Sequence, residues 1–171
     1  MVDFDVVDLG PADHPETGTT VPDFTRPLVS SEFWEDRSLS ALAAEEDGND
    51  LVLVFTPMIG SFVAQYVWTE LAEREWGERA HVVGVSAANP YGIAGFLEER
   101  DLPFEIVADP GNDVAEDYGI AHDLDGMTGL SEPRVAFFAV DADLTVTGSW
   151  VATEWPEFPD YDALEETLGL E

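Results

Sequence analysis

The stretch "FTPMIGSFVAQY" (residues 55–66) joins a predicted strand to a predicted helix and is the first place to look for a functional site. It directly follows the apolar run 51–54. In α/β proteins, ligands and catalytic groups collect at the carboxyl ends of such strands. Here the side chains are mainly apolar, with the hydroxyl of Ser61 among them. The stretch is therefore either a site that lacks a reactive group or a plain connection.

Other motifs give no alternative site. "GVSAA" has the serine of a nucleophile elbow at Ser86, but Ala88 stands where that motif needs glycine. His14, His81 and His122 have no metal-ligand spacing, and we interpret them as surface or strand-end residues. "DLDG" and "DADL" are too short for a calcium loop and predict turns.

The composition excludes several chemistries. The chain has no cysteine, which excludes disulfides, thiolate nucleophiles, zinc–cysteine sites and iron–sulfur clusters. It has no apolar stretch long enough to span a membrane, and its acidic start "MVDFDVVDLG" does not resemble an export signal. With 171 residues and 45% hydrophobic side chains, we expect an acidic lead-in at residues 1–20 and one folded domain at residues 21–171.

Charge is the most pronounced global feature. Thirty-seven acidic residues oppose six basic ones, all arginine, for a formal net charge of −31. The acids are dispersed along the chain, which favours a solvent adaptation over a partner-binding tail. We therefore expect a cytoplasmic haloarchaeal protein in molar salt, where the Debye length is about 3 Å. Binding to nucleic acid or to an anionic membrane is disfavoured, since both need a basic surface.

Strands and helices alternate along the chain. Apolar runs predict buried strands at 51–55, 81–86, 103–109 and 136–140, the last one in a hairpin that ends near residue 151. Helical patterns occur at 38–46, 61–76, 90–102, 110–119 and 161–170. Pro22 and Pro27 predict that segment 21–29 is an arm or an edge strand. This order indicates an α/β sandwich with a mixed central sheet flanked by helices.

The same segments, in the same order, resemble the peroxiredoxins of the AhpC/TSA (alkyl hydroperoxide reductase/thiol-specific antioxidant) redoxin family. "PDFT" (22–25) is similar to the opening segment of that family, and "LVLVFTP" (51–57) to its strand before the active-site proline. "VVGVSAANPYGIAGFLEERDLPFEIVADPGNDVAEDYGI" (82–120) resembles its middle, and "RVAFFAVDADLTV" (134–146) its R-x-x-F-x-I-D strand and hairpin. The resemblance covers residues 21–151 and implies a thioredoxin-like fold of the peroxiredoxin type.

The resemblance also implies site residues. The family motif P-x-x-x-T-x-x-C, counted from Pro57, places Ser61 at the threonine and Ala64 at the peroxidatic cysteine. The active-site arginine of the family matches Arg134. In the family, a thiolate at a helix N-terminus attacks the peroxide O–O bond while arginine and hydroxyl stabilise the charge. An alanine methyl has no lone pair to donate, so the nucleophile is missing.

Arg134 then has three interpretations. It is a buried arginine paired with an acid, part of an anion pocket with Ser61 and the first amides of the helix at 61–76, or an interface residue. We expect the binding residues to be Pro57, Ser61, Ala64 and Arg134, with no catalytic residue, metal or cofactor. The expected partners are a small anion or a protein, including a second copy of the chain in a homodimer.

Two hypotheses of function follow from the resemblance. The first is a redoxin-domain protein without thiol peroxidase activity that acts as a binding or regulatory partner. The second is an antioxidant oxidoreductase of the same family, in which alanine was introduced for a native cysteine or which uses other chemistry. Sequencing the native gene at codon 64 distinguishes an introduced alanine from a native one.

Overall fold

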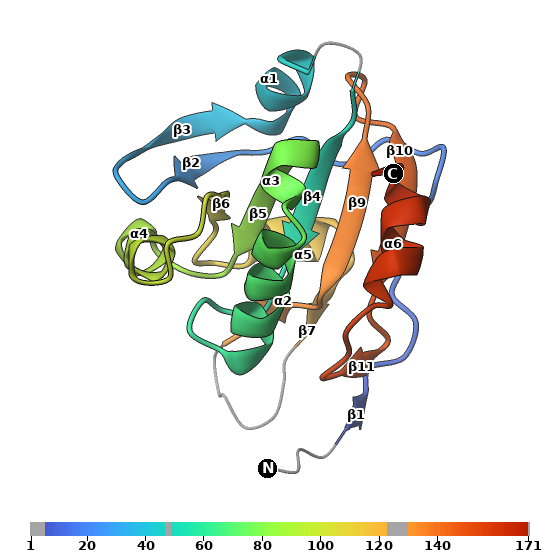
Figure 1. The fold of residues 1–171 in the computed structure, drawn as a ribbon. Helices are drawn as coiled ribbons and strands as arrows, with labels where there is room; N and C mark the ends of the chain where they lie inside the picture. The colour runs from blue at the N-terminus through green and yellow to red at the C-terminus, as the bar shows by residue number, and fades with distance from the viewer. Residues whose placement is uncertain (1–5, 47–48, 123–129, 171) are drawn as a thin grey trace.

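A mixed β-sheet with helices on both faces organises the molecule (Figure 1). The computed structural model describes residues 6–46, 49–122 and 130–170. The helices are α1 (Leu39–Ala44), α2 (Phe62–Glu73), α3 (Trp76–Arg79), α4 (Pro90–Glu99), α5 (Asp113–Asp117) and α6 (Tyr161–Leu168). The strands are β1 (Val7–Asp8), β2 (Thr25–Val29), β3 (Trp34–Ser38), β4 (Leu51–Phe55), β5 (His81–Ser86), β6 (Glu105–Ala108), β7 (Ala121–His122), β8 (Glu132–Pro133), β9 (Ala136–Val140), β10 (Val146–Val151) and β11 (Glu154–Trp155).

Within the described residues, the central sheet has seven strands in the order β10-β9-β4-β5-β6-β2-β3. Strands β4, β5 and β6 are parallel, and antiparallel strands extend the sheet on both sides. The predicted strands β4, β5 and β9 are confirmed, and all five residues of β4 and of β9 are buried. Continuous apolar runs are typical of strands that helices cover on both faces, which is the arrangement here.

Two apolar layers pack against the sheet. On one face, residues of α2, α3, α4 and α6 surround the large side chains of Trp68 and Trp76. On the other face, residues of α1 and α5 pack with Phe55, Tyr118 and Phe138. The predicted α/β sandwich with a mixed sheet is therefore confirmed.

The prediction of an edge strand at 21–29 is wrong in its position. Strand β2 lies between β6 and β3, so β3 forms that edge of the sheet. Pro27 is tolerated because the pairing of β2 with β6 involves only Leu28 and Val29, where no proline nitrogen is needed as a donor. The sequence of β3, "WEDRS", is polar and largely exposed, so no apolar alternation indicated a strand; charged side chains are typical of protected sheet edges.

The predicted helix at 61–76 divides into two helices. Helix α2 ends at Glu73, and Glu75 has a left-handed backbone with φ of 58° before α3 begins at Trp76. Trp76 is fully buried, with its ring 5.8 Å from that of Phe137. Helix α3 then continues through Gly77 to Arg79.

The segment before residue 21 contacts the rest of the molecule. Strand β1 pairs with β11, and Thr20 forms an isolated bridge with Thr145. The amide of Leu9 donates to the carbonyl of Thr153. Residues 1–5 and most of the predicted loop at 122–133 lie outside the described residues. Among the described residues, no helix is both long and apolar enough to cross a bilayer.

Candidate functional site

The predicted site lies where β4 gives way to α2. Pro57 begins a turn in which the amide of Ser61 donates to the carbonyl of Met58 over 3.0 Å. Gly60 has a φ of +99°, a conformation that side chains other than glycine rarely adopt. The turn therefore places Ser61 at the start of the helix in a defined orientation.

Ser61 caps α2. Its Oγ accepts a hydrogen bond of 3.2 Å from the amide of Ala64, which satisfies one of the free donors at the helix N-terminus. Ala64 lies in the first turn of α2 and is fully buried. The hydroxyl and the methyl are thus close together, and the hydroxyl is engaged by the backbone.

Two buried side chains, Glu132 and Ser86, hold the turn from outside. An oxygen of Glu132, in β8, accepts a hydrogen bond of 2.8 Å from the amide of Met58. Ser86, at the end of β5, accepts one of 3.2 Å from the amide of Ile59. Sequence reasoning missed both roles. Ser86 is a fully buried acceptor that shapes the turn, consistent with its rejection as a nucleophile.

Arg134 is buried and donates to backbone carbonyls. Its guanidinium bonds Leu9 over 3.0 Å, Ala152 over 3.2 Å, and also Gly10. Burial lowers the pKa of Arg134. Within the described residues no acid is among its hydrogen-bond or ion-pair partners, so these residues give no support to the interpretation of Arg134 as an arginine paired with an acid. Carbonyl dipoles replace it and anchor the segment that follows β1.

The match of Arg134 to the family arginine depends on the count. In the motif R-x-x-F-x-I-D the arginine lies six positions before the aspartate, whereas Arg134 lies seven positions before Asp141. Matching Phe137 selects Arg134, and matching Asp141 selects Val135. Val135 packs in the same apolar cluster as Ala64. The structure thus brings together Pro57, Ser61 and Ala64, while Arg134 donates hydrogen bonds to the N-terminal segment and to Ala152.

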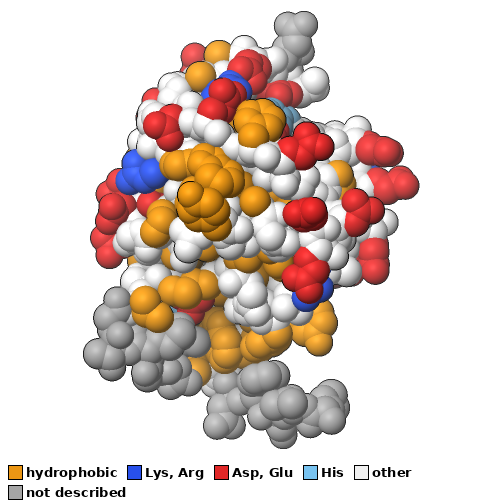
Figure 2. Space-filling model, turned by 90° about the vertical axis from the view of Figure 1, so that its left-hand side faces the viewer, with side chains coloured by type: hydrophobic (Ala, Val, Ile, Leu, Met, Phe, Trp, Pro, Cys, Tyr) orange, Lys and Arg blue, Asp and Glu red, His pale blue; other side chains and the backbone are white. Residues whose placement is uncertain are grey.

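A groove of about 560 Å³ runs beside the turn. Met58, Ile59 and Gly60 line one side of it, and α4 lines the other with Tyr91 and Phe96. Tyr91 is 77% exposed and touches Trp34 of β3, with 5.1 Å between the ring centroids. Figure 2 shows this side of the molecule, where hydrophobic side chains gather in the middle of the face and acidic ones surround them.

The chemistry of this arrangement is limited. The junction contains backbone amides, the Ser61 hydroxyl that caps α2 and the Ala64 methyl group, and it has no thiol. Within the described ranges, no group of three or more His, Asp or Glu side chains is placed to hold a metal ion. The junction therefore has no thiolate to attack a peroxide; the thioether of Met58 could be oxidised by one, but without a reductant that is not turnover.

Solved structures of similar fold support the topology. A peroxidoxin BcpB from Mycobacterium tuberculosis has 25% identity and a TM-score of 0.70, over 92% of this chain and 96% of that chain. A reduced 2-Cys peroxiredoxin from Plasmodium vivax has 16% identity and a TM-score of 0.72, over 90% and 80%. The AhpC of Enterococcus faecalis has 17% identity and a TM-score of 0.66, over 91% of each chain.

The comparison with curated proteins found no match. The profile of one protein family does match, over residues 17–149, which is most of the chain, and its description is the AhpC/TSA family. The structural neighbours are peroxiredoxins and agree with the predicted thioredoxin-like fold of the peroxiredoxin type. Order of elements, site position and sequence profile lead to one conclusion: the chain belongs to the AhpC/TSA family.

Proposed function

We propose that this protein is a redoxin-fold binding or regulatory protein without thiol peroxidase activity. One observation carries the proposal. At the first turn of α2, where the family motif has its cysteine, Ala64 presents a fully buried methyl group, and no cysteine occurs elsewhere in the chain. Peroxide reduction by this family needs a thiolate at that place, because the sulfur supplies the electron pair that breaks the O–O bond.

The ligand would bind at the carboxyl end of β4, around Pro57, Ser61 and Ala64. The groove beside Met58 and α4 offers apolar surface with polar groups at its rim, such as Gln65 and Asn89. Its occupant is a small anion or a segment of a protein, and a homodimer is one form of the latter. Arg134 can contribute to this site only if its guanidinium breaks its hydrogen bonds to the carbonyls of Leu9 and Gly10. Its role in binding stays a prediction.

The setting we propose is the cytoplasm of a haloarchaeon. The formal charge of −31 without any lysine supports a protein adapted to molar salt. No cofactor is required by the proposed binding function. An antioxidant oxidoreductase whose native cysteine is absent here is the alternative, and sequencing the native gene at codon 64 separates the two.

The experiment compares the protein with its Ala64→Cys variant in molar KCl. We expect no catalytic consumption of hydrogen peroxide by the unmodified chain. In the variant, the thiolate would attack one peroxide oxygen, giving a sulfenic acid and releasing the other oxygen as water. The helix N-terminus favours the thiolate, so this thiol should react faster than that of Ser31→Cys, which lies exposed in the turn between β2 and β3, away from any helix start.

Each outcome decides one part of the proposal. Turnover by the unmodified chain would refute it. Reaction of Ala64→Cys no faster than that of Ser31→Cys would mean that the junction is only packing and that the ligand site lies elsewhere. Arg134→Ala in the Ala64→Cys background tests the arginine: a slower reaction supports its place in the site, and an unchanged rate assigns it to the N-terminal segment.

A further inference from the structure

A second groove lies between α2 and α6, away from the junction described above. It has a volume of about 380 Å³. Tyr66, Thr69, Glu70 and Glu73 of α2 line one side, and Phe158 and Tyr161 line the other. Figure 1 shows both helices on the same face of the sheet. It shares no lining residue with the groove beside Met58, so an inference about it does not depend on the proposed function.

Aromatic rings form the apolar part of this groove. Tyr66 and Phe158 meet edge to face with 6.0 Å between their centroids, and Phe62 extends the row toward Trp155. Tyr66 is 63% exposed and Phe158 is 39% exposed, so these rings present large areas to a ligand. The face of an aromatic ring carries negative potential and attracts a cation. Rings in this arrangement therefore favour a positively charged ligand with apolar substituents.

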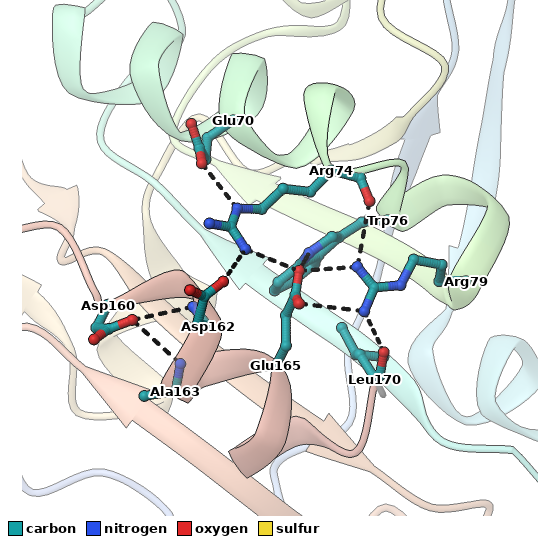
Figure 3. A network of polar contacts seen from close by, with 9 residues as sticks. All are labelled: Glu70, Arg74, Trp76, Arg79, Asp160, Asp162, Ala163, Glu165 and Leu170. Atoms are coloured by element: carbon teal, nitrogen blue, oxygen red, sulfur yellow. Dashed lines mark hydrogen bonds and ion pairs between the residues drawn. The ribbon is translucent and has the colours of Figure 1, made fainter.

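The charges around the groove have the sign that a cation needs. Glu70 and Glu73 contribute carboxylates directly. The neighbouring guanidinium of Arg74 is compensated by Glu70 at 2.8 Å, Asp162 at 2.9 Å and Glu165 at 3.3 Å (Figure 3). Carboxylates thus outnumber the guanidinium at this place, in a chain whose formal charge is −31. An anion in this groove would be repelled by the carboxylates that line it.

The molecule already contains one contact of the proposed kind beside the groove. The guanidinium carbon of Arg74 lies 5.3 Å from the ring centroid of Tyr161. Burial raises the pKa of Tyr161, which keeps its phenol neutral. The Tyr161 hydroxyl oxygen is buried and has no hydrogen-bond partner within the described residues.

We propose that this groove binds a small alkylated ammonium cation, held against the rings of Tyr66 and Phe158 and balanced by Glu70 and Glu73. Alkyl groups make the cation weakly hydrated, so it loses little on entering an aromatic site. In molar salt, attraction by the carboxylates alone is screened beyond about 3 Å. Contact with the ring faces acts at shorter range and persists.

The test uses choline as the probe, in molar KCl, with binding followed by calorimetry and by the proton resonances of the aromatic rings. Its matched control is the uncharged alcohol in which a carbon atom replaces the ammonium nitrogen. Since cation–π contacts at exposed sites contribute about 0.5–1 kcal/mol each, choline should bind at least about threefold more tightly than the alcohol. Equal binding of the two compounds, or no binding of choline, would overturn the proposal.

Variants locate the site. Tyr66→Ala should weaken choline binding about threefold, and Glu73→Gln about twofold, with circular dichroism checking that both remain folded. Tyr91→Ala removes a ring that is more exposed than Tyr66 and lies outside this groove, and it should leave the affinity unchanged. If Tyr66→Ala is unfolded, the choline affinity of Glu73→Gln is the deciding measurement. An affinity that neither groove variant changes, or that Tyr91→Ala lowers as much as they do, would refute this assignment.

Discussion

The two ends of helix α2 differ in charge: uncharged groups lie at its start, and ion pairs lie at its end. At its start lie the Ser61 hydroxyl, which caps the helix, and the Ala64 methyl group. The family motif has its reactive thiolate at this junction. At its end, Arg74 and Arg79 converge on Glu165 of α6, as Figure 3 shows. Two of the six basic residues of the chain therefore hold the last helix, although basic residues are scarce here.

Glu165 is the centre of the second region. It accepts hydrogen bonds from Arg79 at 2.9 Å, from the indole of Trp76 at 3.0 Å and from Arg74 at 3.3 Å. The hydrogen bond from Arg79, followed by those from Trp76 and Arg74, lowers the pKa of Glu165 to about 2, against the opposing effect of burial. Arg79 also donates to the carbonyl of Leu170, beyond the end of α6. The network thus ties the C-terminal segment to α2 and α3.

The difference between these regions shows that a chain can keep the fold of its family without the reactive group. The start of α2 keeps the proline, the turn and the cap, which serve the backbone, without the sulfur that would serve a reaction. The end of α2 has a charged network whose contacts are all accounted for by holding α6 in place. On this comparison, charge at the end of α2 stabilises the structure, whereas binding at the start of α2 is our proposal.

Removing salt should have the largest effect, because it acts on the whole chain. We expect cooperative folding in molar KCl and loss of structure on dialysis to low salt, since 37 acids then repel one another across the surface. Ion pairs such as those of Glu165 would strengthen at low salt, but six basic residues are too few to compensate. Circular dichroism over a KCl series measures this. An unchanged melting temperature between about 0.1 M and about 3 M KCl would remove the argument for a halophilic protein.

Glu165→Gln tests the network at the end of α2. The variant loses the charge that Arg74 and Arg79 share, and we expect the free energy of unfolding to fall by about 2 kcal/mol. Denaturant titration in molar KCl measures the change. The matched control is Glu166→Gln, an exposed neighbour on the same helix, which should change the stability by less than about 0.5 kcal/mol.

Acid titration of the same pair sharpens this prediction. The folded pKa of Glu165 is about 2, below its ordinary value of 4.5, so its contribution is complete above that ordinary value and decreases as the pH falls through about 2. The Glu166→Gln protein should lose this part of its stability between these pH values, and the Glu165→Gln protein should not. Identical acid profiles for the two variants would show that the network does not stabilise the fold.

Ser61→Ala gives the smallest expected effect and tests the other end of α2. The variant loses the hydrogen bond from the amide of Ala64, and a lost N-cap costs about 1 kcal/mol of stability. Ser61→Thr keeps the hydroxyl and should restore most of it. A change near zero for Ser61→Ala would mean that the hydroxyl is free to serve a ligand, and the comparison between the two helix ends would then need revision.

Much of the fold could be predicted because it depends on local patterns. The apolar runs of β4, β5 and β9 can only be buried strands in a chain with helices between them. The caps at Ser38 and Ser61 act over three residues, so their signals are contained in the sequence around each helix start. The missing nucleophile is likewise a property of the sequence alone, since no tertiary structure can supply a thiol to a chain without cysteine.

Only the tertiary structure decided which distant groups meet. Glu132 contacts the turn at Met58 across 74 positions, and Arg134 reaches Leu9 across 125. In a chain with 37 acids, the sequence cannot select Glu165 as the partner of Arg79, because every acid carries the same charge and only the packing of α6 chooses among them. The position of β2 inside the sheet was settled in the same way, by the polar strand β3 pairing beyond it.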